Sequence, residues 1–160
     1  MQHIWSPWRM EYLENHEREN GCIFCKAQAV SDGPENLIAY RGNLGYVILN
    51  RFPYTSGHLM VAPFAHLASL EELDSATRSE LMDLLAASIG ALRRVYAPQA
   101  FNVGANIGEA AGAGVKEHFH MHVVPRWVGD TSFMSALGQT RVLPEALADT
   151  YQRLHSALRS

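Results

Sequence analysis

Three histidines stand at alternate positions in the stretch EHFHMHVVPRW, and they are the residues of this chain best suited to chemistry. The apolar residues between them predict a β-strand, on which side chains alternate between two faces. His118, His120 and His122 would then share one face, while Phe119 and Met121 pack against the core. A lone histidine on such a face is typical of a solvated edge, but three in register indicate a functional site.

Two kinds of chemistry fit this histidine strand. At a rise of about 3.3 Å per residue, the outer two Cα atoms lie roughly 13 Å apart, so the three rings are poorly placed to bind one ion, although a pair can. A neutral imidazole is also a nucleophile toward phosphorus, because one ring nitrogen has a free lone pair near neutral pH. The spacing favours the nucleophile, which needs an acceptor for its other nitrogen and donors around the phosphate.

The stretch NVGANIGEAAGAGVKEH, which leads into the strand, can supply those donors. Its glycines allow backbone N–H groups to approach anionic oxygens closely, and Asn102 and Asn106 add side-chain amides. Glycine and alanine also make flexible loops, so the neighbouring histidines are what make this stretch a candidate phosphate site. The glycines are Gly104, Gly108, Gly112 and Gly114.

The two cysteines of the chain, Cys22 and Cys25, have C-x-x-C spacing. In a reducing compartment this spacing indicates a metal clip or a redox pair rather than a structural disulfide. No thioredoxin-like helix pattern follows the pair, so we favour zinc over redox chemistry. Two metal-free core cysteines are the third interpretation.

These residues must be positioned by a fold, and its pattern is that of an α+β domain, a mainly antiparallel five-stranded sheet with one long helix and a C-terminal helix. The long helix is predicted to begin after Asp74, a suitable N-cap, and to end near 96–98. Pro144 suits the first position of the C-terminal helix, which is predicted to run to about 158. Short apolar segments predict strands at 36–40, 44–49, 58–62, 101–106 and 118–124, the first two forming a hairpin.

Composition limits the classes of function. A chain of 160 residues with 48% hydrophobic and 18% charged residues predicts one globular domain, without repeats or linkers. A net charge of -3 excludes a general basic field, so no partnership with nucleic acid or acidic lipid is expected. The chain shows no signal-peptide pattern and no run of the roughly 18 apolar residues that span a membrane, so we expect a cytoplasmic protein.

The run His118 to Val124 resembles the signature of the histidine triad (HIT) superfamily, and NRFPYTSGHLMVAPFAH resembles its upstream segment. The resemblance extends from about Cys22 to Phe133. The segments WSPWRMEYL and HVVPRWVGDTSF look most like the bacterial diadenosine tetraphosphate phosphorylase and fragile-histidine-triad-like branch. The resemblance implies an adenine nucleotide as substrate and a homodimer that joins two sheets. An apolar strand edge would be the local cause of such a dimer.

The resemblance also implies roles for individual residues. His120 would attack the α-phosphorus to form a nucleotidyl-histidine, and His122 and His58 would polarise the phosphate and assist the leaving group. Asn50 matches a ribose-binding position. Asn106, with the backbone at Gly112 and Gly114, would hold the phosphates, although many relatives carry a polar side chain where this chain has Ala113 and Gly114. The base pocket would be walled by Ile23, Phe24 and Ile48, and Ile48 fits the core equally well.

Zinc-bearing members of the superfamily complete the cysteine pair with two histidines, which here are His66 and His118. Cys22, Cys25, His66 and His118 would then form a closed structural zinc set, with no part in catalysis. His3, His16 and His155 lie outside the motifs and are expected at the surface.

The leading hypothesis is therefore a nucleotidyl transferase or hydrolase that cleaves dinucleoside polyphosphates through adenylyl-His120. Three alternatives remain open: a hydrolase of other adenylyl compounds, a nucleotide-binding module with little catalysis, and a metallohydrolase with zinc at the triad. Galactose-1-phosphate uridylyltransferase shares the chemistry, but this chain is too short for its two-repeat form.

Overall fold

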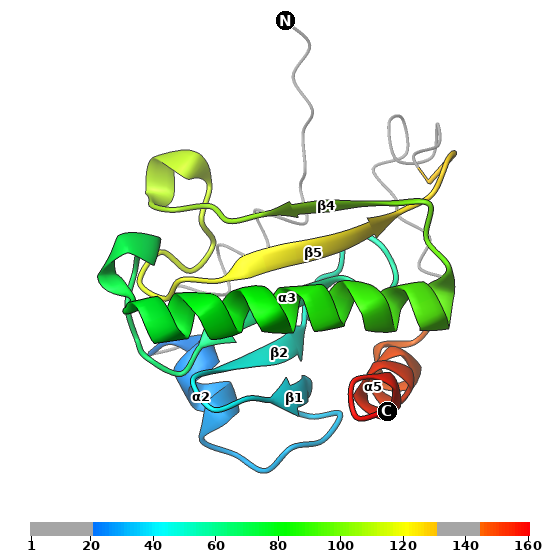
Figure 1. Ribbon diagram of the computed structural model, residues 1–160, viewed down its shortest axis with the longest axis horizontal. Helices are drawn as coiled ribbons and strands as arrows, with labels where there is room; N and C mark the ends of the chain where they lie inside the picture. Colours follow the sequence, from blue (N-terminus) through cyan, green and yellow to red (C-terminus); the bar gives the residue numbers. More distant parts are fainter. Residues whose placement is uncertain (1–20, 131–144) are drawn as a thin grey trace, which may run out of the picture.

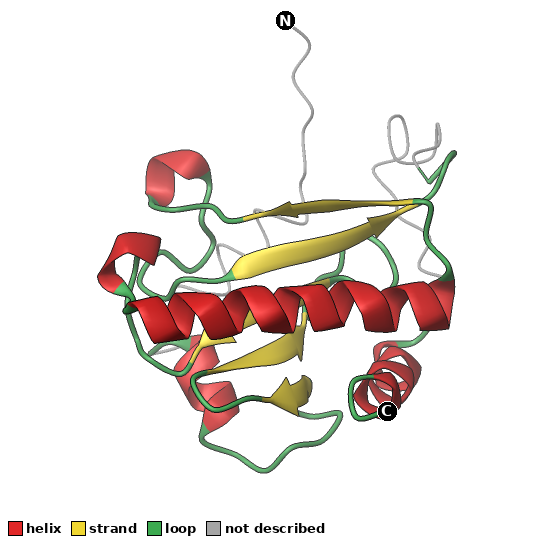
Figure 2. Cartoon of the chain, in the orientation of Figure 1, coloured by secondary structure: helices red, strands yellow, loops and turns green. Residues whose placement is uncertain are grey.

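The computed structural model describes residues 21–130 and 145–160 (Figure 1). One sheet of order β1-β2-β3-β5-β4, in which every neighbouring pair is antiparallel, forms the centre of the fold. Helices α2, α3 and α5 lie around this sheet (Figure 2), so the α+β prediction is confirmed. The elements are α2 (Ile23–Gln28), β1 (Ile38–Arg41), β2 (Gly45–Leu49), β3 (Leu59–Pro63), η1 (Leu70–Glu72), α3 (Ser75–Tyr96), β4 (Ala100–Gly104), η2 (Glu109–Ala111), β5 (Met121–Arg126) and α5 (Leu147–Ala157).

The long helix α3 crosses one face of the sheet (Figure 1). It begins as predicted, because the Asp74 side chain accepts a hydrogen bond from the backbone N–H of Thr77. It ends at Tyr96, and the C-cap residue Ala97 has a left-handed φ of 46°. Apolar residues at helical spacing predict that one side of this helix packs in the core. They are confirmed as buried or half-buried, and they are Leu81, Leu84, Leu85, Ile89, Leu92 and Val95.

The predicted hairpin of β1 and β2 is confirmed, but β1 begins later than position 36. The Asn36 side chain accepts hydrogen bonds from the backbone N–H groups of Gly33 and Ile38, and Leu37 has a φ of 64°. This turn holds the chain out of the sheet until Ile38. Strand β4 also differs from its predicted range of 101–106, because its pairing with β5 ends at Gly104.

The strand predicted over 118–124 instead begins at Met121. Its partner β3 ends at Pro63, which has no N–H to offer the ladder. The Pro63 carbonyl accepts from the His118 ring, and the Phe119 N–H donates to the Leu67 carbonyl. The backbone before Met121 therefore bonds outside the sheet, which is a tertiary effect that local sequence does not encode.

The C-terminal helix α5 begins at Leu147, and its predicted start at Pro144 lies outside the described residues. Ala146 is extended, and just before it the Glu145 carboxylate accepts hydrogen bonds from the Tyr96 and Thr150 hydroxyls. These bonds connect α5 to α3 and hold the chain extended ahead of the helix.

His155, which was expected at the surface, is half-buried on α5 and makes contacts with its neighbours. Its Nδ1 donates to the Ala39 carbonyl at 2.9 Å, and its ring stacks on Tyr151. Helix α5 packs beside β1, which explains this burial. His3 and His16 lie outside the described residues. Among the helices that the structure describes, none has the length and apolarity needed to cross a bilayer.

Candidate functional site

The rings of the three motif histidines lie close together, although only His122 belongs to β5. The Phe24 ring lies 5.0 Å from the His118 ring and 4.8 Å from the His120 ring, and the His122 ring lies 5.0 Å from that of His120. Phe119, between them, is 3% exposed and belongs to the core. The histidine side chains therefore lie together while Phe119 packs in the core, as the alternation in the sequence predicts.

His120 is positioned as a nitrogen nucleophile. Its Nδ1 donates to the His118 carbonyl at 2.9 Å, so in the neutral ring the proton sits on Nδ1 and Nε2 carries the lone pair. The side chain is 6% exposed, and burial lowers its pKa below the usual range. The ring is thus neutral near pH 7, as nucleophilic attack requires.

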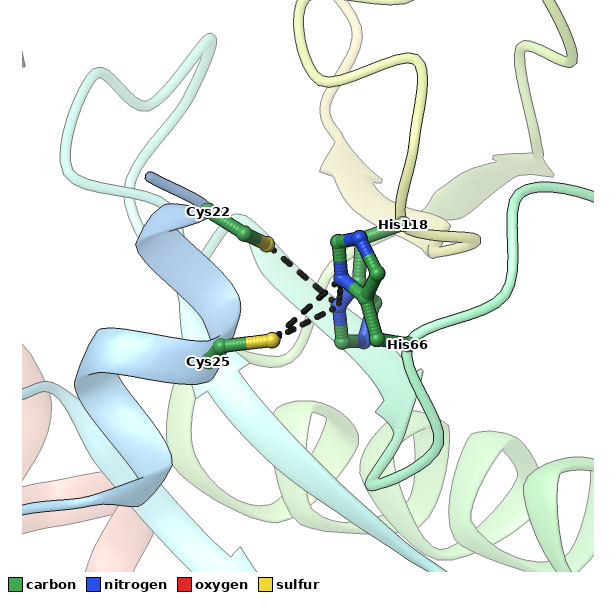
Figure 3. Close-up of side chains that lie close together, drawn as sticks. All are labelled: Cys22, Cys25, His66 and His118. Atoms are coloured by element: carbon green, nitrogen blue, oxygen red, sulfur yellow. Dashed lines mark hydrogen bonds between the residues drawn. The ribbon is translucent and has the colours of Figure 1, made fainter. Parts of the chain in front are cut away.

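His118 turns its ring in another direction. Its Nε2 donates to the Pro63 carbonyl at 2.9 Å, which leaves a lone pair on Nδ1, and burial lowers its pKa. That Nδ1 lies 3.4 Å from the Cys22 Sγ, 3.7 Å from the Cys25 Sγ and 3.3 Å from the His66 Nδ1 (Figure 3). The sequence-predicted metal set is therefore brought together in the structure.

This four-residue cluster has the spacing of a tetrahedral site. Its four candidate ligand atoms lie within 4.8 Å of one another, and the Cys25 Sγ lies 3.3 Å from the His66 Nδ1. At zinc bond lengths of about 2.0–2.3 Å, tetrahedral nitrogen and sulfur ligands are roughly 3.3–3.8 Å apart. The carbonyl on the far side of His118 also orients the ring as zinc-bound histidines require. The cluster thus fits zinc.

The Cys22 thiol does not have the electrostatics of a reactive thiol in a redox pair. Reactive thiols in such pairs have a lowered pKa, whereas burial raises the pKa of Cys22 to about 11. Both cysteines are free thiols at the start of α2, where Cys22 is the N-cap. Figure 3 shows them facing His66 and His118, which come from the segment after β3 and the segment before β5.

A second pair of histidines, His58 and His122, lies beside His120. The Tyr54 backbone N–H donates to the His58 Nδ1 at 3.1 Å, which places the His58 proton on Nε2 in the neutral ring. The His58 Nε2 lies 3.0 Å from the His122 Nδ1 and donates to it. Neutral His122 then carries its proton on Nε2, where it can donate to a phosphate oxygen.

Two of the predicted nucleotide-binding residues, Asn50 and Phe24, lie beside these histidines. The Asn50 Nδ2 is 3.5 Å from the His58 Nε2, and its Oδ1 accepts from the Phe52 N–H. Phe24 is buried against His118 and His120. The other two pocket candidates are Ile23, half-buried on α2, and Ile48, 7% exposed in β2 within the hydrophobic core.

The predicted phosphate loop connects β4 to β5 and starts beside the triad, because Gly104 pairs with His122. Gly112 has a φ of 84°, a left-handed conformation that favours glycine, and ends the short helix η2. Asn106 and Gly114 are half-buried on either side of η2. Asn102 does not belong to this loop, since its Oδ1 accepts from Arg126 at 2.8 Å.

Three groups at the site were missed by sequence reasoning. They are the carbonyls of Pro63 and His118 and the backbone N–H of Tyr54, each of which determines a histidine tautomer. Backbone groups have no side-chain signature, so no pattern in the sequence indicates them. The Tyr54 ring, 4.7 Å from that of His58, was also missed. An aromatic residue four positions before a motif histidine is its only signal.

Comparison with known proteins agrees with this geometry. The family model described as HIT domain matches residues 33–128. An AP-4-A phosphorylase of Mycobacterium tuberculosis is 39% identical over 96% of this chain and 83% of its own length. An adenylylsulfatase of Arabidopsis thaliana is 28% identical over 71% of this chain and 56% of its own.

Solved structures share the fold. The crystal structure of a Zn-bound histidine triad family protein from Mycobacterium smegmatis superposes with a TM-score of 0.69 and 27% identity, covering 87% of this chain and 94% of the other. A uridylyltransferase structure has a TM-score of 0.69 over 96% of this chain and 50% of its own, at 15% identity, which shows the fold alone. From the domain match, the relative and the arrangement of its histidines, the chain belongs to the histidine triad (HIT) family.

Proposed function

We propose that this protein is a nucleotidyl transferase that cleaves dinucleoside polyphosphates, with diadenosine tetraphosphate as the reference substrate and phosphate as the acceptor. The observation that carries the proposal is the orientation of His120, whose Nδ1 is held by a carbonyl while its Nε2 keeps a lone pair. The AP-4-A phosphorylase relative supports the choice of substrate.

The reaction has two steps. The His120 Nε2 lone pair forms a bond to the α-phosphorus, and the bond from that phosphorus to the bridging oxygen breaks, so the leaving polyphosphate takes the electron pair. A phosphate oxygen then attacks the same phosphorus, and the electron pair of the phosphorus–nitrogen bond returns to His120. Diadenosine tetraphosphate thus yields ATP in the first step and ADP in the second.

His122 and His58 would assist both steps. The His122 Nε2–H donates to a phosphate oxygen and stabilises the charge that develops on it, while the His58 Nε2–H holds the His122 ring in that tautomer. Asn50 would contact the ribose, and Ile23, Phe24 and Ile48 would line the base pocket. The phosphates would be held by Asn106 and by backbone N–H groups around Gly112 and Gly114.

Zinc in the cluster of Cys22, Cys25, His66 and His118 would have a structural role. The four residues supply four ligands, so no coordination position remains for a substrate or a reactive water. When bound, zinc would keep the two cysteines as thiolates and tie α2 to the segment that leads into β5. Activity would come from His120, whose nucleophilic nitrogen is outside this ligand set.

The assembly and the compartment are part of the same proposal. β4 is an edge strand in the described part of the chain, and its Val103 is 45% exposed, which supports a homodimer joined along this edge. The two free cysteines support a reducing compartment, so we place the protein in the cytoplasm.

Product chromatography tests the function. Diadenosine tetraphosphate is incubated with the protein, with and without phosphate, and the nucleotides are separated. ADP and ATP formed only with phosphate would support the phosphorylase, whereas AMP and ATP formed without phosphate would make the protein a hydrolase. Absence of cleavage under both conditions would overturn the proposal.

A second candidate substrate is adenosine 5'-phosphosulfate, favoured by the adenylylsulfatase relative. The same His120 would attack its α-phosphorus, and sulfate would leave in place of a polyphosphate. Faster release of sulfate than of ATP, at equal substrate concentrations, would favour this candidate over the dinucleotide.

A further inference from the structure

The segment between β2 and β3 places an aromatic side chain over the histidine pair. The Tyr54 ring centroid lies 4.7 Å from that of His58 and 6.3 Å from that of His122. His58 beneath it is 2% exposed, whereas Tyr54 is 40% exposed. One side of the ring therefore covers the site while the rest of it is open to solvent.

The segment that carries Tyr54 is held in place by hydrogen bonds. The Tyr54 backbone N–H donates to the His58 Nδ1, and the Thr55 Oγ1 donates to the Pro125 carbonyl at 2.9 Å. Gly57 has a φ of 80°, and a Cβ there would come within 2.8 Å of Leu92 on α3. The segment thus turns tightly against α3, and a ligand that stacks on Tyr54 meets a surface that is already ordered.

Tyr54 lies at one end of a row of aromatic rings that runs through the site. The aromatic rings follow one another in the order Phe24, His120, His122 and Tyr54, with centroid separations of 4.8, 5.0 and 6.3 Å. Under the proposed function, Phe24 would line the pocket for the base of the nucleotide that His120 retains. The reacting phosphate would then lie by His120 and His122, and the rest of the substrate would extend past His122 toward Tyr54.

A dinucleoside polyphosphate carries a second base on that leaving part, and bases stack readily on exposed aromatic side chains. We propose that the exposed part of the Tyr54 ring stacks on the base of the leaving nucleotide and so selects dinucleotides over mononucleoside polyphosphates. This specificity rests on the proposed function, because it assigns the second half of the same substrate.

The test compares two substrates with the same phosphate chain. Diadenosine tetraphosphate has a second base, and adenosine 5'-tetraphosphate lacks it. In Tyr54→Leu, the ratio of kcat/KM for the dinucleotide to kcat/KM for the mononucleotide should fall roughly tenfold. This factor corresponds to the lower part of the range of binding effects measured when one base stacks on one aromatic ring. The change should come mainly from KM for the dinucleotide, because stacking away from the reacting phosphate is equal in the ground and transition states.

Three further variants complete the design. Tyr54→Phe keeps the ring and should hold the ratio within about twofold, and Tyr54→Trp enlarges the ring and should raise the ratio. Met82→Ala removes a similarly exposed apolar side chain, 55% exposed on α3, and should leave both rates and the ratio unchanged. Thermal melting of each variant identifies any that fail to fold, and Tyr54→Trp still tests the inference if Tyr54→Leu is one of them.

The outcomes separate this inference from the proposed function. If Tyr54→Leu lowers kcat/KM for both substrates by the same factor, Tyr54 only packs against His58 and His122, and the stacking inference is wrong. An unchanged ratio in Tyr54→Trp would also reject it. If the wild-type protein cleaves neither substrate, the proposed function fails, and this inference fails with it.

Discussion

Each histidine at the candidate site is held through one ring nitrogen, and that partner determines what the other nitrogen can do. Carbonyl oxygens hold His118 and His120, which leaves a lone pair on the Nδ1 of the first and on the Nε2 of the second. A backbone N–H holds His58, which leaves a donor. An imidazole side chain can therefore be a metal ligand, a nucleophile or a hydrogen-bond donor, according to the backbone group that it contacts.

The contact between His58 and His122 leads to the first prediction. His58→Ala should lower kcat/KM for diadenosine tetraphosphate roughly 10- to 100-fold, because His122 loses the donor that fixes its tautomer. His58→Gln supplies an amide N–H in place of the imidazole donor and should lose less. Steady-state kinetics of both variants check this order. Equal activity of His58→Ala and the wild type would contradict the arrangement.

At this scale the sequence identified side chains but not their orientations. The alternation of His118, His120 and His122 with apolar residues was enough to predict which side chains face the site. Their tautomers depend on backbone groups at Pro63 and Tyr54 that reach them only through the fold. Any residue type at those positions offers the same carbonyl, and any except proline offers the same N–H, so the sequence cannot indicate them.

At the scale of elements, the cysteine–histidine cluster joins segments that the sheet alone does not hold together. Cys22 and Cys25 belong to the start of α2, His66 to the segment after β3, and His118 to the segment before β5 (Figure 3). A metal ion bound here would fix α2, and with it Phe24, against the histidines of the site.

Removal of zinc is predicted to cost stability before it affects the chemistry. Dialysis against a chelator should lower Tm by several degrees, while cleavage at a temperature well below the melting range persists. Cys25→Ser should bind less zinc and show a smaller shift on chelation. Elemental analysis and calorimetry measure both effects. Activity that disappears in a fully folded, zinc-free protein would instead indicate a catalytic metal.

The contact between α3 and α5 gives a second prediction at this scale. Tyr96→Phe keeps the ring but loses the hydroxyl that donates to Glu145, so the free energy of unfolding should fall by about 1 kcal/mol near pH 7. Burial and this hydrogen bond raise the pKa of Tyr96 to about 12, above its ordinary value near 10. Because the folded pKa is raised, the stabilisation is complete below pH 10 and is lost between pH 10 and about 12.

Denaturant unfolding of the wild type and Tyr96→Phe at several pH values measures this difference. Tyr46, whose pKa is also raised by burial, titrates in both proteins and cancels in the comparison. A difference that grows as the pH rises above 10 would contradict the assignment of the hydrogen bond.

The sequence predicted which elements exist better than where they end. Local signals were sufficient for α3, where Asp74 caps the helix and the apolar stripe follows helical spacing. They failed where a distant partner takes the backbone or the side chain, as Leu67 does for Phe119 and Ala39 does for His155. Such contacts form only when the chain is folded, so they move element ends and bury residues without a local pattern.

At the scale of the whole molecule, the sheet has an edge that can extend it into a second copy. Val103 of β4 is 45% exposed, and Ile107 just beyond the strand is 44% exposed. In the described ranges β4 pairs only with β5, so its outer edge is available to another strand.

If the protein forms a homodimer along this edge, one negative charge introduced into β4 should weaken the dimer. Val103→Asp should shift the molar mass measured by light scattering from two chains toward one at micromolar concentration, because like charges would meet across the two-fold axis. Val128→Asp, at an 89% exposed position just after the end of β5, is the matched control and should leave the mass unchanged. A wild-type protein that is already monomeric would reject the dimer.

The central claim is that His120 forms a covalent bond to the α-phosphorus. The most direct measurement is intact-protein mass spectrometry after a brief incubation with diadenosine tetraphosphate in the absence of phosphate, quenched without acid because phosphoramidates are acid-labile. The account predicts a mass increase of one adenylyl group, located on His120 by peptide mapping and lost when phosphate is added. His120→Ala should fold, show no adduct and turn over roughly a thousandfold or more slowly. Full turnover by His120→Ala, or an adduct on another residue, would contradict the account.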